Sequence, residues 1–497
     1  MRRDGTERIP KSFVSNGNGS WWLFCLGIVV LKFSLLAIDP LPKLCMGDSG
    51  SYLWTALTGW IPEDRSFFYG YVIRWLSLWT QSLSSLLIVQ VFLSVLIAII
   101  VAWICGAVFG LTNRFAYLFG FLCSIDPLQL EWERSIMTET FSLFFYTLVL
   151  QQSFVYLRDR RITTLLMIQI LSVITIGFRM SFFIVIQVMT VALPLIAFLV
   201  GPRSTETATA VGSRLKFLKC AVFWRHLAAS VVAMFLLDQG YQHAYGFLSH
   251  REPARLHGTG YILLSVWAPA LQPQGATDPR LAEIIKHGSE FGLRDMSFRM
   301  AQKFRPGFLV DRWCRTETDP RKSSKIARET ALRAFRRNPA GVITLAAKTY
   351  FAAWRMMREY AKSDIICRSP EDRQPTAEDL NKSFGQRFHL FVALADLPSK
   401  PNTIIRRYYV SASPYYLVLL LSPLLSFLLL FIARNKGQAL LLFVHTAVVF
   451  AGTFLLCFLP VVRLLQPLSL LTLLSLALAV KSVLDLRSAA PTGCTLV

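Results

Sequence analysis

Three acidic residues stand beside or inside apolar segments, where a carboxylate can do chemistry. Asp48 follows the first apolar run, within Gly-Asp-Ser-Gly-Ser-Tyr, and Glu139 opens a later apolar run. Desolvation near a membrane raises the pKa of a carboxyl group, which suits a general base that takes a proton from a hydroxyl. We therefore predict Asp48 and Glu139 as catalytic candidates, together with Glu133, which stands shortly before Glu139.

Each of these acids also has a purely structural interpretation. Asp48 followed by small residues is typical of an Asx turn or a helix N-cap. Glu133 can be a solvated surface acid. An ionisable group such as Glu139 at the start of an apolar span is costly, so it serves as a buried hydrogen-bonding hub or in catalysis. The residues alone leave both interpretations open.

Two arginines interrupt apolar segments in a similar way. Arg179 lies in Gly-Phe-Arg-Met-Ser and Arg463 in Val-Val-Arg-Leu-Leu. Either side chain can cap a helix end or anchor it at the membrane surface. A guanidinium also presents a planar fork of donors that fits phosphate oxygens in two contacts. We predict that both arginines bind a phosphate group that enters from the bilayer.

The composition indicates an integral membrane protein. Of the 497 residues, 54% are apolar and 16% are charged, and the mean hydropathy is +0.46. Soluble proteins have about 25% charged residues. The net charge of +22 fits basic cytoplasmic loops and anionic lipid head groups, or a phosphorylated ligand. No nucleic-acid-binding module accompanies this charge, so we expect no nucleic-acid partner.

The apolar segments predict an all-α polytopic membrane protein with about ten transmembrane helices and a mainly helical extracytoplasmic domain. A span needs about 20 largely apolar residues. One candidate, residues 115–125, is short and fits a tilted or re-entrant helix. The ten candidates are residues 21–38, 83–111, 115–125, 136–157, 162–178, 181–200, 220–237, 415–433, 439–459 and 468–486.

Basic residues in the short connections orient these spans. With ten spans, the basic connections all fall on one side, which the positive-inside rule makes cytoplasmic. They are residues 1–11, 113–114, 158–161, 203–219, 434–436 and 481–487. The opposite side receives a first outer loop (39–82), a turn (126–135), Arg179, a long segment (238–414) and a turn at 460–467. Within the first outer loop, residues 66–79 mix aromatic and apolar side chains and predict an interfacial helix.

The long segment divides the chain into three parts. We predict an N-terminal transmembrane catalytic module over residues 1–237, an extracytoplasmic domain over 238–414 and a C-terminal transmembrane module over 415–497. Long loops cross membranes largely regardless of charge, so the basic middle part does not contradict the topology. Cys314 and Cys367 both lie in this middle part, and the sequence leaves open whether they pair.

This topology gathers the candidate residues at one membrane face. The topology was derived from basic residues in other connections, yet it places five candidate residues at the extracytoplasmic membrane face. These are Asp48, Glu133, Glu139, Arg179 and Arg463. Acids and arginines at one rim favour a common site over five independent helix caps.

The order of these motifs resembles the GT-C glycosyltransferases, in particular the bacterial branch of protein mannosyltransferases and of lipid A aminoarabinose and galacturonic acid transferases. The resemblance covers about the first two hundred residues and the last eighty, and it rests on short motifs. These are Asp48 and Tyr52 in the first outer loop, the stretch from Arg65 to Arg74 after them, Met137-Thr138-Glu139 at the start of a span, Arg179 at the start of another, and Arg463-x-x-x-Pro467 before the last span.

The resemblance implies transfer of a sugar from a polyprenyl-phosphate donor to a glycan, lipid or protein acceptor, with inversion, outside the cytoplasm. Asp48 would be the general base, and arginines would stabilise the departing lipid phosphate. The substrate-binding residues implied are Tyr52, Arg65, Arg74, Arg179 and Arg463. The resemblance also favours the bacterial cell inner membrane as the location.

Some features depart from that family or leave alternatives open. Some relatives have two adjacent acids in the first loop, whereas Ser49 follows Asp48 here. No acid pair stands at metal spacing, so we predict no metal ligand, while a divalent cation as cofactor stays open. The main alternative is a transporter or flippase of lipid-linked glycans, because charged residues in spans also mark substrate paths. Another polyprenyl-lipid enzyme, such as a ligase, or a non-catalytic scaffold are further alternatives.

Overall fold

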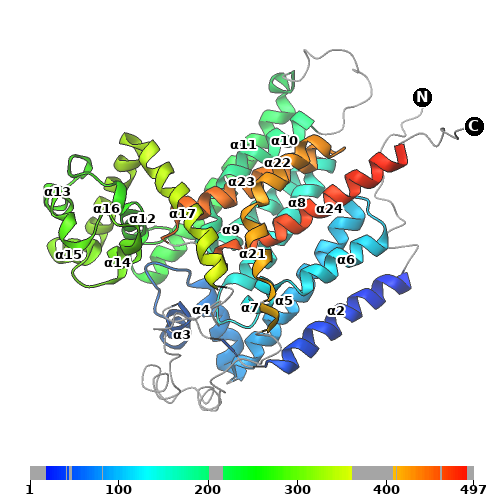
Figure 1. The fold of residues 1–497 in the computed structure, drawn as a ribbon, viewed down its shortest axis with the longest axis horizontal. Helices are drawn as coiled ribbons and strands as arrows, with labels where there is room; N and C mark the ends of the chain where they lie inside the picture. The colour runs from blue at the N-terminus through cyan, green and yellow to red at the C-terminus, as the bar shows by residue number, and fades with distance from the viewer. Residues whose placement is uncertain are drawn as a thin grey trace, which may run out of the picture.

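The computed structural model describes residues 18–40, 42–43, 48–80, 82–200, 216–360, 407–409, 411–458 and 462–489. These residues form helices and loops, and their one β-bridge, between Lys43 and Ser135, is isolated. Figure 1 shows a bundle of long helices with a smaller helical unit beside one end. The basic segment 1–11 and Cys367 lie outside the described residues.

The N-terminal part supplies most of the bundle. Its long helices are apolar on nearly every face, as expected for spans that contact both lipid and other helices. Its elements are α2 (Asn18–Ile38), α3 (Asp48–Thr58), α4 (Phe68–Ile73), η1 (Arg74–Leu78), α5 (Leu83–Trp103), η2 (Ile104–Val108), α6 (Asn113–Ser124), α7 (Pro127–Trp132), α8 (Glu139–Asp159), α9 (Ile162–Phe178), η3 (Met180–Phe182), α10 (Phe183–Val200), η5 (Lys216–Lys219) and α11 (Ala221–Ser249).

A smaller unit follows α11 and has its own apolar core. Leu264, Leu281, Leu309 and Trp313 are buried in it and pack together. Its elements are α12 (Thr259–Val266), η6 (Ala268–Ala270), η7 (Pro273–Gly275), α13 (Pro279–Lys286), η8 (Gly288–Phe291), η9 (Met296–Phe298), α14 (Arg299–Phe304), α15 (Leu309–Thr316) and α16 (Pro320–Arg337). The predicted boundary at residue 237 falls inside α11, and the division into three parts stays a prediction.

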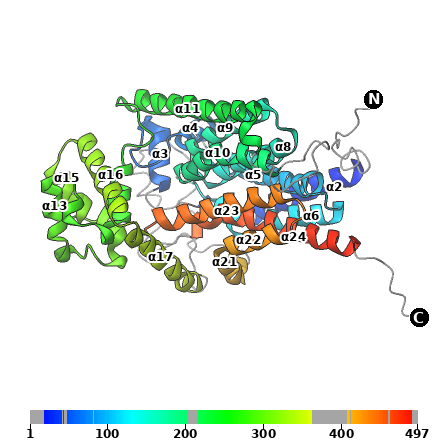
Figure 2. The ribbon, with the colours of Figure 1, turned by 90° about the horizontal axis from the view of Figure 1, so that it is seen from above.

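The C-terminal part returns to the bundle. α17 (Pro339–Tyr360) leads from the small unit to the side of α21 and α23, as Figure 2 shows from above. The remaining elements are α21 (Ser413–Leu420), α22 (Ser422–Ile432), α23 (Lys436–Leu456), η10 (Val462–Leu465) and α24 (Gln466–Ala489). η10 and the start of α24 bring Arg463 and its neighbours back to α3 and α8.

The prediction of a helical polytopic membrane protein is confirmed. Among the described residues, seven helices are long and apolar enough to cross a membrane, and the bent pair α21 and α22, with a 60° bend, makes up to eight. The two further predicted spans, 115–125 and 162–178, form the shorter helices α6 and α9. Every predicted span therefore coincides with a helix or a bent helix pair.

Helix starts are marked in the sequence by aspartate followed by proline. Asp126, Asp278 and Asp319 each accept a hydrogen bond from a backbone N–H two or three residues later, and the next residue is proline in each case. The carboxylate satisfies a free N–H of the first turn, and the proline fixes a helical φ where no N–H is needed. These caps explain why α7, α13 and α16 begin where they do.

Polar side chains connect the helices within the apolar bundle. Tyr146 Oη and His445 Nδ1 lie 2.8 Å apart and join α8 to α23, and Tyr156 Oη and His226 Nδ1 lie 2.9 Å apart and join α8 to α11. Such hydrogen bonds between transmembrane helices are worth on the order of 0.6 to 2 kcal/mol each. They hold α8 in place and so fix the position of Glu139, which is the first residue of α8.

Candidate functional site

Two carboxylates lie at the N-termini of α3 and α8. Asp48 is the first residue of α3 and Glu139 the first of α8. A helix N-terminus carries partial positive charge, so both positions favour an ionised acid. Ser49 Oγ donates a hydrogen bond to the backbone oxygen of Ile136 at 2.9 Å, which ties the start of α3 to the chain just before α8.

The loop after α3 is fixed to two other parts of the chain. Tyr245 Oη of α11 donates to the backbone oxygen of Pro62 at 2.9 Å. The backbone N–H of Gly258, just before α12, donates to the backbone oxygen of Glu63 at 2.8 Å. The loop that carries Arg65 is therefore held by the bundle on one side and by the small unit on the other.

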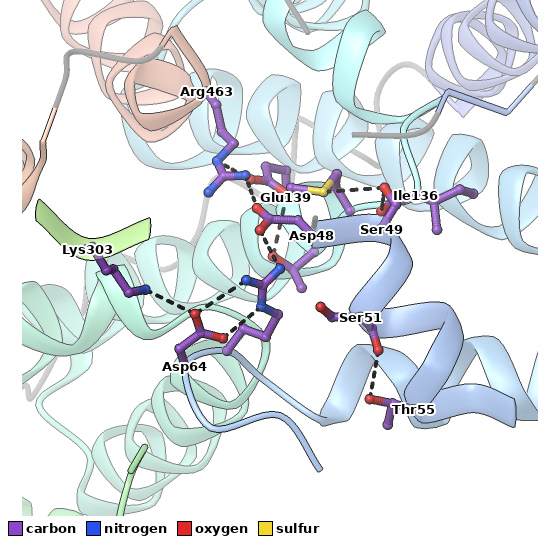
Figure 3. A network of polar contacts seen from close by, with 12 residues as sticks. Asp48, Ser49, Ser51, Thr55, Asp64, Ile136, Glu139, Lys303 and Arg463 are labelled. Atoms are coloured by element: carbon purple, nitrogen blue, oxygen red, sulfur yellow. Dashed lines mark hydrogen bonds and ion pairs between the residues drawn. The ribbon is translucent and has the colours of Figure 1, made fainter. Parts of the chain in front are cut away.

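Asp48 is held between two guanidinium groups. Arg65 Nη1 donates to Asp48 Oδ1 at 2.5 Å, and Arg463 Nη1 donates to Asp48 Oδ2. The three residues come from α3, from the following loop and from η10 near the end of the chain. Figure 3 shows Asp48 facing Arg463, with Glu139 beside both. The two carboxylate oxygens thus each have their own cation.

Glu139 shares Arg463 with Asp48 and also faces a second arginine. Arg463 Nε lies 3.3 Å from Glu139 Oε1, and Arg179 Nη2 lies 3.6 Å from the same oxygen. Arg179 Nη2 also donates to the backbone oxygen of Arg463 at 3.3 Å. The side chain of Glu139 is 1% exposed, so this carboxylate neutralises charge within the protein and orients both arginines.

A further ion pair links the small unit to this site. Asp64 Oδ1 accepts from Arg65 Nε at 3.0 Å, and Asp64 Oδ2 accepts from Lys303 Nζ of α14 at 3.0 Å (Figure 3). Burial raises the pKa of Asp64, but the hydrogen bond from Arg65 and the charge of Lys303 outweigh it and lower the pKa to about 2. Asp64 is therefore a carboxylate at every pH of interest and holds Arg65 toward Asp48.

We call this set the acid–arginine network. Its members are Asp48, Asp64, Arg65, Glu139, Arg179, Lys303 and Arg463. The side chains of Asp48 and Arg463 are 26% and 32% exposed. Those of Glu139 and Arg179 are buried. A ligand can therefore reach the network from one side, while its other side is anchored in the bundle.

The prediction that desolvation raises the pKa of Asp48 is wrong. Burial does raise the pKa, but the charges of Arg463 and Arg65 outweigh burial, and the pKa of Asp48 lies below its ordinary value. Arg65 lies 17 positions after Asp48, but Arg463 reaches Asp48 from 415 positions away, and the local sequence does not reveal that contact. In this state Asp48 is ionised but weakly basic, because two cations stabilise its negative charge.

Tyr52 forms part of the inner wall of the site. It is buried, and its ring packs edge-to-face on Tyr69 at 5.1 Å between centroids. Burial and the negative charges of Asp48 and Glu139 raise the pKa of Tyr52. The phenol keeps its proton, so Tyr52 can act as a hydrogen-bond donor beside the two carboxylates but not as a base.

Glu133 does not join the acid–arginine network. Its Oε2 accepts from Lys32 Nζ at 2.6 Å, and both side chains are fully buried. This pair belongs to a second set, the buried ion cluster, which lies where α2 meets α7. Its members are Lys32, Asp39, Lys43, Glu131, Glu133 and Arg134.

Arg74 also lies outside the acid–arginine network. It is the first residue of η1 and is exposed. No ion pair involves Arg74 among the described residues. Trp75 and Trp79 in the same segment are strongly exposed, at 81% and 87%. This agrees with a helix that lies at the membrane surface, since exposed aromatic residues favour the lipid–water interface.

The structure therefore brings together six of the eight predicted site residues. They are Asp48, Tyr52, Arg65, Glu139, Arg179 and Arg463, while Glu133 and Arg74 lie elsewhere. Sequence reasoning missed Asp64 and Lys303. Asp64 stands directly before Arg65, which was a usable signal, whereas Lys303 reaches the site only through the folding of the small unit.

Among the described residues, no group of three or more His, Cys, Asp or Glu side chains is arranged to hold a metal ion. The acids of the network instead contact cationic side chains. Arg179 Nη1 is buried and has no hydrogen-bond partner within the part of the chain that the structure describes. The arrangement offers two partly exposed carboxylates, Asp48 and Asp64, beside several guanidinium donors. Such groups can accept a proton and bind an anion at neighbouring points.

Neither a protein-family model nor a curated protein matches this chain. The chain is similar to the crystal structure of ArnT from Cupriavidus metallidurans bound to undecaprenyl phosphate. The identity is 14%, the match covers 93% of this chain and 78% of that one, and the TM-score is 0.36. At this TM-score the likeness decides neither the fold nor the function of the chain.

Proposed function

We propose that this protein transfers a sugar from a polyprenyl-phosphate donor to an acceptor hydroxyl, with inversion, at the extracytoplasmic face of a bacterial inner membrane. The observation that carries the proposal is Asp48 held between Arg65 and Arg463 at one end of the helix bundle. The donor's phosphate would come from the bilayer, and the polar acceptor from the aqueous side. The network lies where these two would meet.

The reaction assigns a different task to the acid and to the arginines. Asp48 takes the proton of the acceptor hydroxyl as its oxygen forms a bond to the anomeric carbon. The bond between that carbon and the phosphate oxygen breaks, and its electron pair leaves with the polyprenyl phosphate. The leaving group gains negative charge, and Arg463 and Arg179 stabilise it. The proton on Asp48 then passes to solvent.

The ion pairs of the network explain how Asp48 becomes a better base when the donor binds. Arg463 is shared between Asp48 and Glu139, and its side chain is partly exposed. A phosphate that takes up the guanidinium fork of Arg463 removes one of the charges that keep the pKa of Asp48 low. Donor binding therefore raises the basicity of Asp48, and Glu139 keeps the arginines in place during the exchange.

Transfer by the purified protein tests this proposal. The assay incubates the protein with labelled polyprenyl-phosphate sugars and candidate acceptors and measures glycosyl transfer or slow donor hydrolysis. Asp48→Asn should lower turnover by about 10²- to 10⁴-fold, the usual contribution of a general base. Its unfolding temperature should stay that of the wild type.

A matched control removes a carboxylate outside the site. Asp311→Asn removes an acid of α15 that pairs with Arg315, and it should transfer at the wild-type rate. Wild-type turnover by Asp48→Asn would remove Asp48 as the base. Donors that the wild type binds but does not consume with any acceptor would instead favour a transporter or flippase of lipid-linked glycans.

A further inference from the structure

A cavity lies at the end of the helix bundle opposite to the acid–arginine network, between the ends of α8 and α24. It has a volume of about 780 Å³ and lies between η2, α8, α10, α23 and α24. Arg158 of α8 and Lys481 of α24 line it, whereas Glu139 is the first residue of α8 and Arg463 lies in η10, directly before α24. At about 1.5 Å per residue, Lys481 lies on the order of 22 Å along α24 from its first residue, Gln466. The cavity is therefore separate from the network.

The rim of this cavity is basic. Four cationic residues line it (Arg158, Arg434, Lys436 and Lys481) against the single acid Asp485, which gives a formal charge of 4 − 1 = +3. They come from three of the connections whose basic residues predicted the cytoplasmic side. That three distant connections meet at one cavity supports the predicted orientation of the bundle.

The rim cations differ in how far they are engaged. Lys481 Nζ lies 2.7 Å from Asp485 Oδ1, and Lys436 Nζ donates to backbone oxygens at the end of α22. Arg434 is exposed, and no hydrogen bond or ion pair of its side chain is found among the described residues. Its guanidinium can therefore accept an anion without first losing a partner.

The wall of the cavity is apolar. Among its apolar lining residues, Ala107, Val108, Val155 and Val200 are partly exposed, whereas Phe109, Phe154, Ile196 and Leu478 are buried behind them. A free inorganic anion would gain nothing from such a wall, because apolar side chains offer it no hydrogen bonds. A molecule with an anionic head and a hydrocarbon chain complements both parts of the cavity at once.

We propose that this cavity binds an anionic phospholipid. Its phosphate lies against Arg434 and Lys481, and the upper part of an acyl chain lies along the apolar wall. The volume falls within the range of pockets that hold small molecules, about 300 to 1,000 Å³, so it accommodates a head group and part of one chain. The bound lipid fills the gap between the ends of α8, α10 and α24 and stabilises their packing.

Lipid titration of the delipidated protein in detergent tests the proposal. The probes are phosphatidylglycerol, phosphatidylethanolamine and inorganic phosphate, and the readouts are the unfolding temperature and the number of lipids retained in native mass spectrometry. Phosphatidylglycerol should raise the unfolding temperature of the wild type, and the other two should not. Arg434→Gln with Lys481→Gln should weaken phosphatidylglycerol binding by on the order of 30-fold, about fivefold for each lost cation.

The matched control removes the same charge from another exposed surface. Arg333→Gln with Arg336→Gln neutralises two exposed arginines of α16 and should leave phosphatidylglycerol binding unchanged. Equal loss in both double variants, or an equal response to phosphatidylethanolamine, would overturn the proposal. A response to inorganic phosphate alone would overturn it in favour of a simple anion site. If the Lys481 change prevents folding, Arg434→Gln alone gives the same test with about a fivefold effect.

Discussion

The acid–arginine network and the buried ion cluster both pair carboxylates with cations, but they differ in access to solvent. The side chains of Lys32 and Glu133 are fully buried and lie 2.6 Å apart. Those of Asp48 and Arg463 are 26% and 32% exposed. A ligand can reach the partly exposed pair and replace one of its partners. In the buried pair, loss of a partner leaves a charge without water or a counter-ion.

This difference in solvent access indicates that the two charged sets have different roles in the protein. In the buried ion cluster, opposite charges neutralise one another, and the pair of Lys32 and Glu133 connects α2 to the end of α7. In the acid–arginine network, Arg463 contacts two acids and retains an exposed edge, so its partners can change during a reaction. The comparison predicts that variants in the two sets fail in different ways, in stability for one and in turnover for the other.

The largest effect on stability should come from breaking the buried pair. Glu133→Gln leaves Lys32 as an uncompensated buried cation and should cost about 3 to 5 kcal/mol of stability. Adding Lys32→Met should recover most of this loss, because both charges are then gone. The measurement is the unfolding temperature in detergent, followed by the turnover of the protein that remains folded.

Glu133 was also predicted from the sequence as a catalytic candidate, and the same variants decide between the two roles. Unchanged turnover per folded molecule in the double variant fits the structural role. An unaltered unfolding temperature combined with lost turnover in Glu133→Gln would contradict the comparison and make Glu133 part of the reaction.

The next largest effect is the loss of turnover when Arg463 can no longer bind the donor phosphate. Arg463→Ala should reduce turnover by about 10²- to 10³-fold, as expected for removal of one donor to a developing anion. Arg463→Lys keeps the charge but loses the planar fork, so its rate should lie between those of the wild type and the alanine variant. Steady-state kinetics with the polyprenyl-phosphate donor provides the measurement.

Arg74 gives a matched control for Arg463, since it is an exposed arginine that makes no ion pair with the network among the described residues. Arg74→Ala should turn over at close to the wild-type rate. Equal losses in Arg74→Ala and Arg463→Ala would show that general positive charge, and not the contact with Asp48, supports the reaction.

A smaller effect should appear in the pH dependence. The pKa of Asp48 lies below its ordinary value of about 3.9, so its basic form persists until the pH falls below that value. Arg65→Gln removes one of the two cations that lower this pKa. The pKa then rises, and the acid limb of kcat/KM should move to higher pH, because kcat/KM reports the free enzyme. An unmoved limb, or one displaced to lower pH, would contradict this account.

The sequence predicted the helices well and the site in part, for physical reasons. Apolar runs of sufficient length form membrane helices wherever they occur, so every predicted span coincides with a helix or a bent pair. Arg179 and Arg463 could be found because a charge inside an apolar segment is costly. Contacts between distant residues could not be found. Asp48 and Arg463 are 415 positions apart, and their pairing reverses the direction predicted for the pKa of Asp48.

Glu133 and Glu139 show most clearly what could not be predicted from the sequence. Both are acids in one short stretch next to an apolar span, and both were predicted as catalytic candidates. Glu139 begins α8 and faces Arg463, whereas Glu133 follows α7 and faces Lys32. The turn between α7 and α8 determines these directions, and its geometry depends on tertiary contacts such as the bridge between Lys43 and Ser135.

The exchange of Arg463 between Asp48 and a phosphate is the central claim, and equilibrium binding of polyprenyl phosphate to Asp48→Asn tests it most directly. Asp48 competes with the phosphate for Arg463 and Arg65, so Asp48→Asn should bind polyprenyl phosphate more tightly than the wild type while it loses transfer. Arg463→Ala should bind it more weakly. Weaker binding by Asp48→Asn than by the wild type would contradict the claim and show that Asp48 only holds the arginines in position.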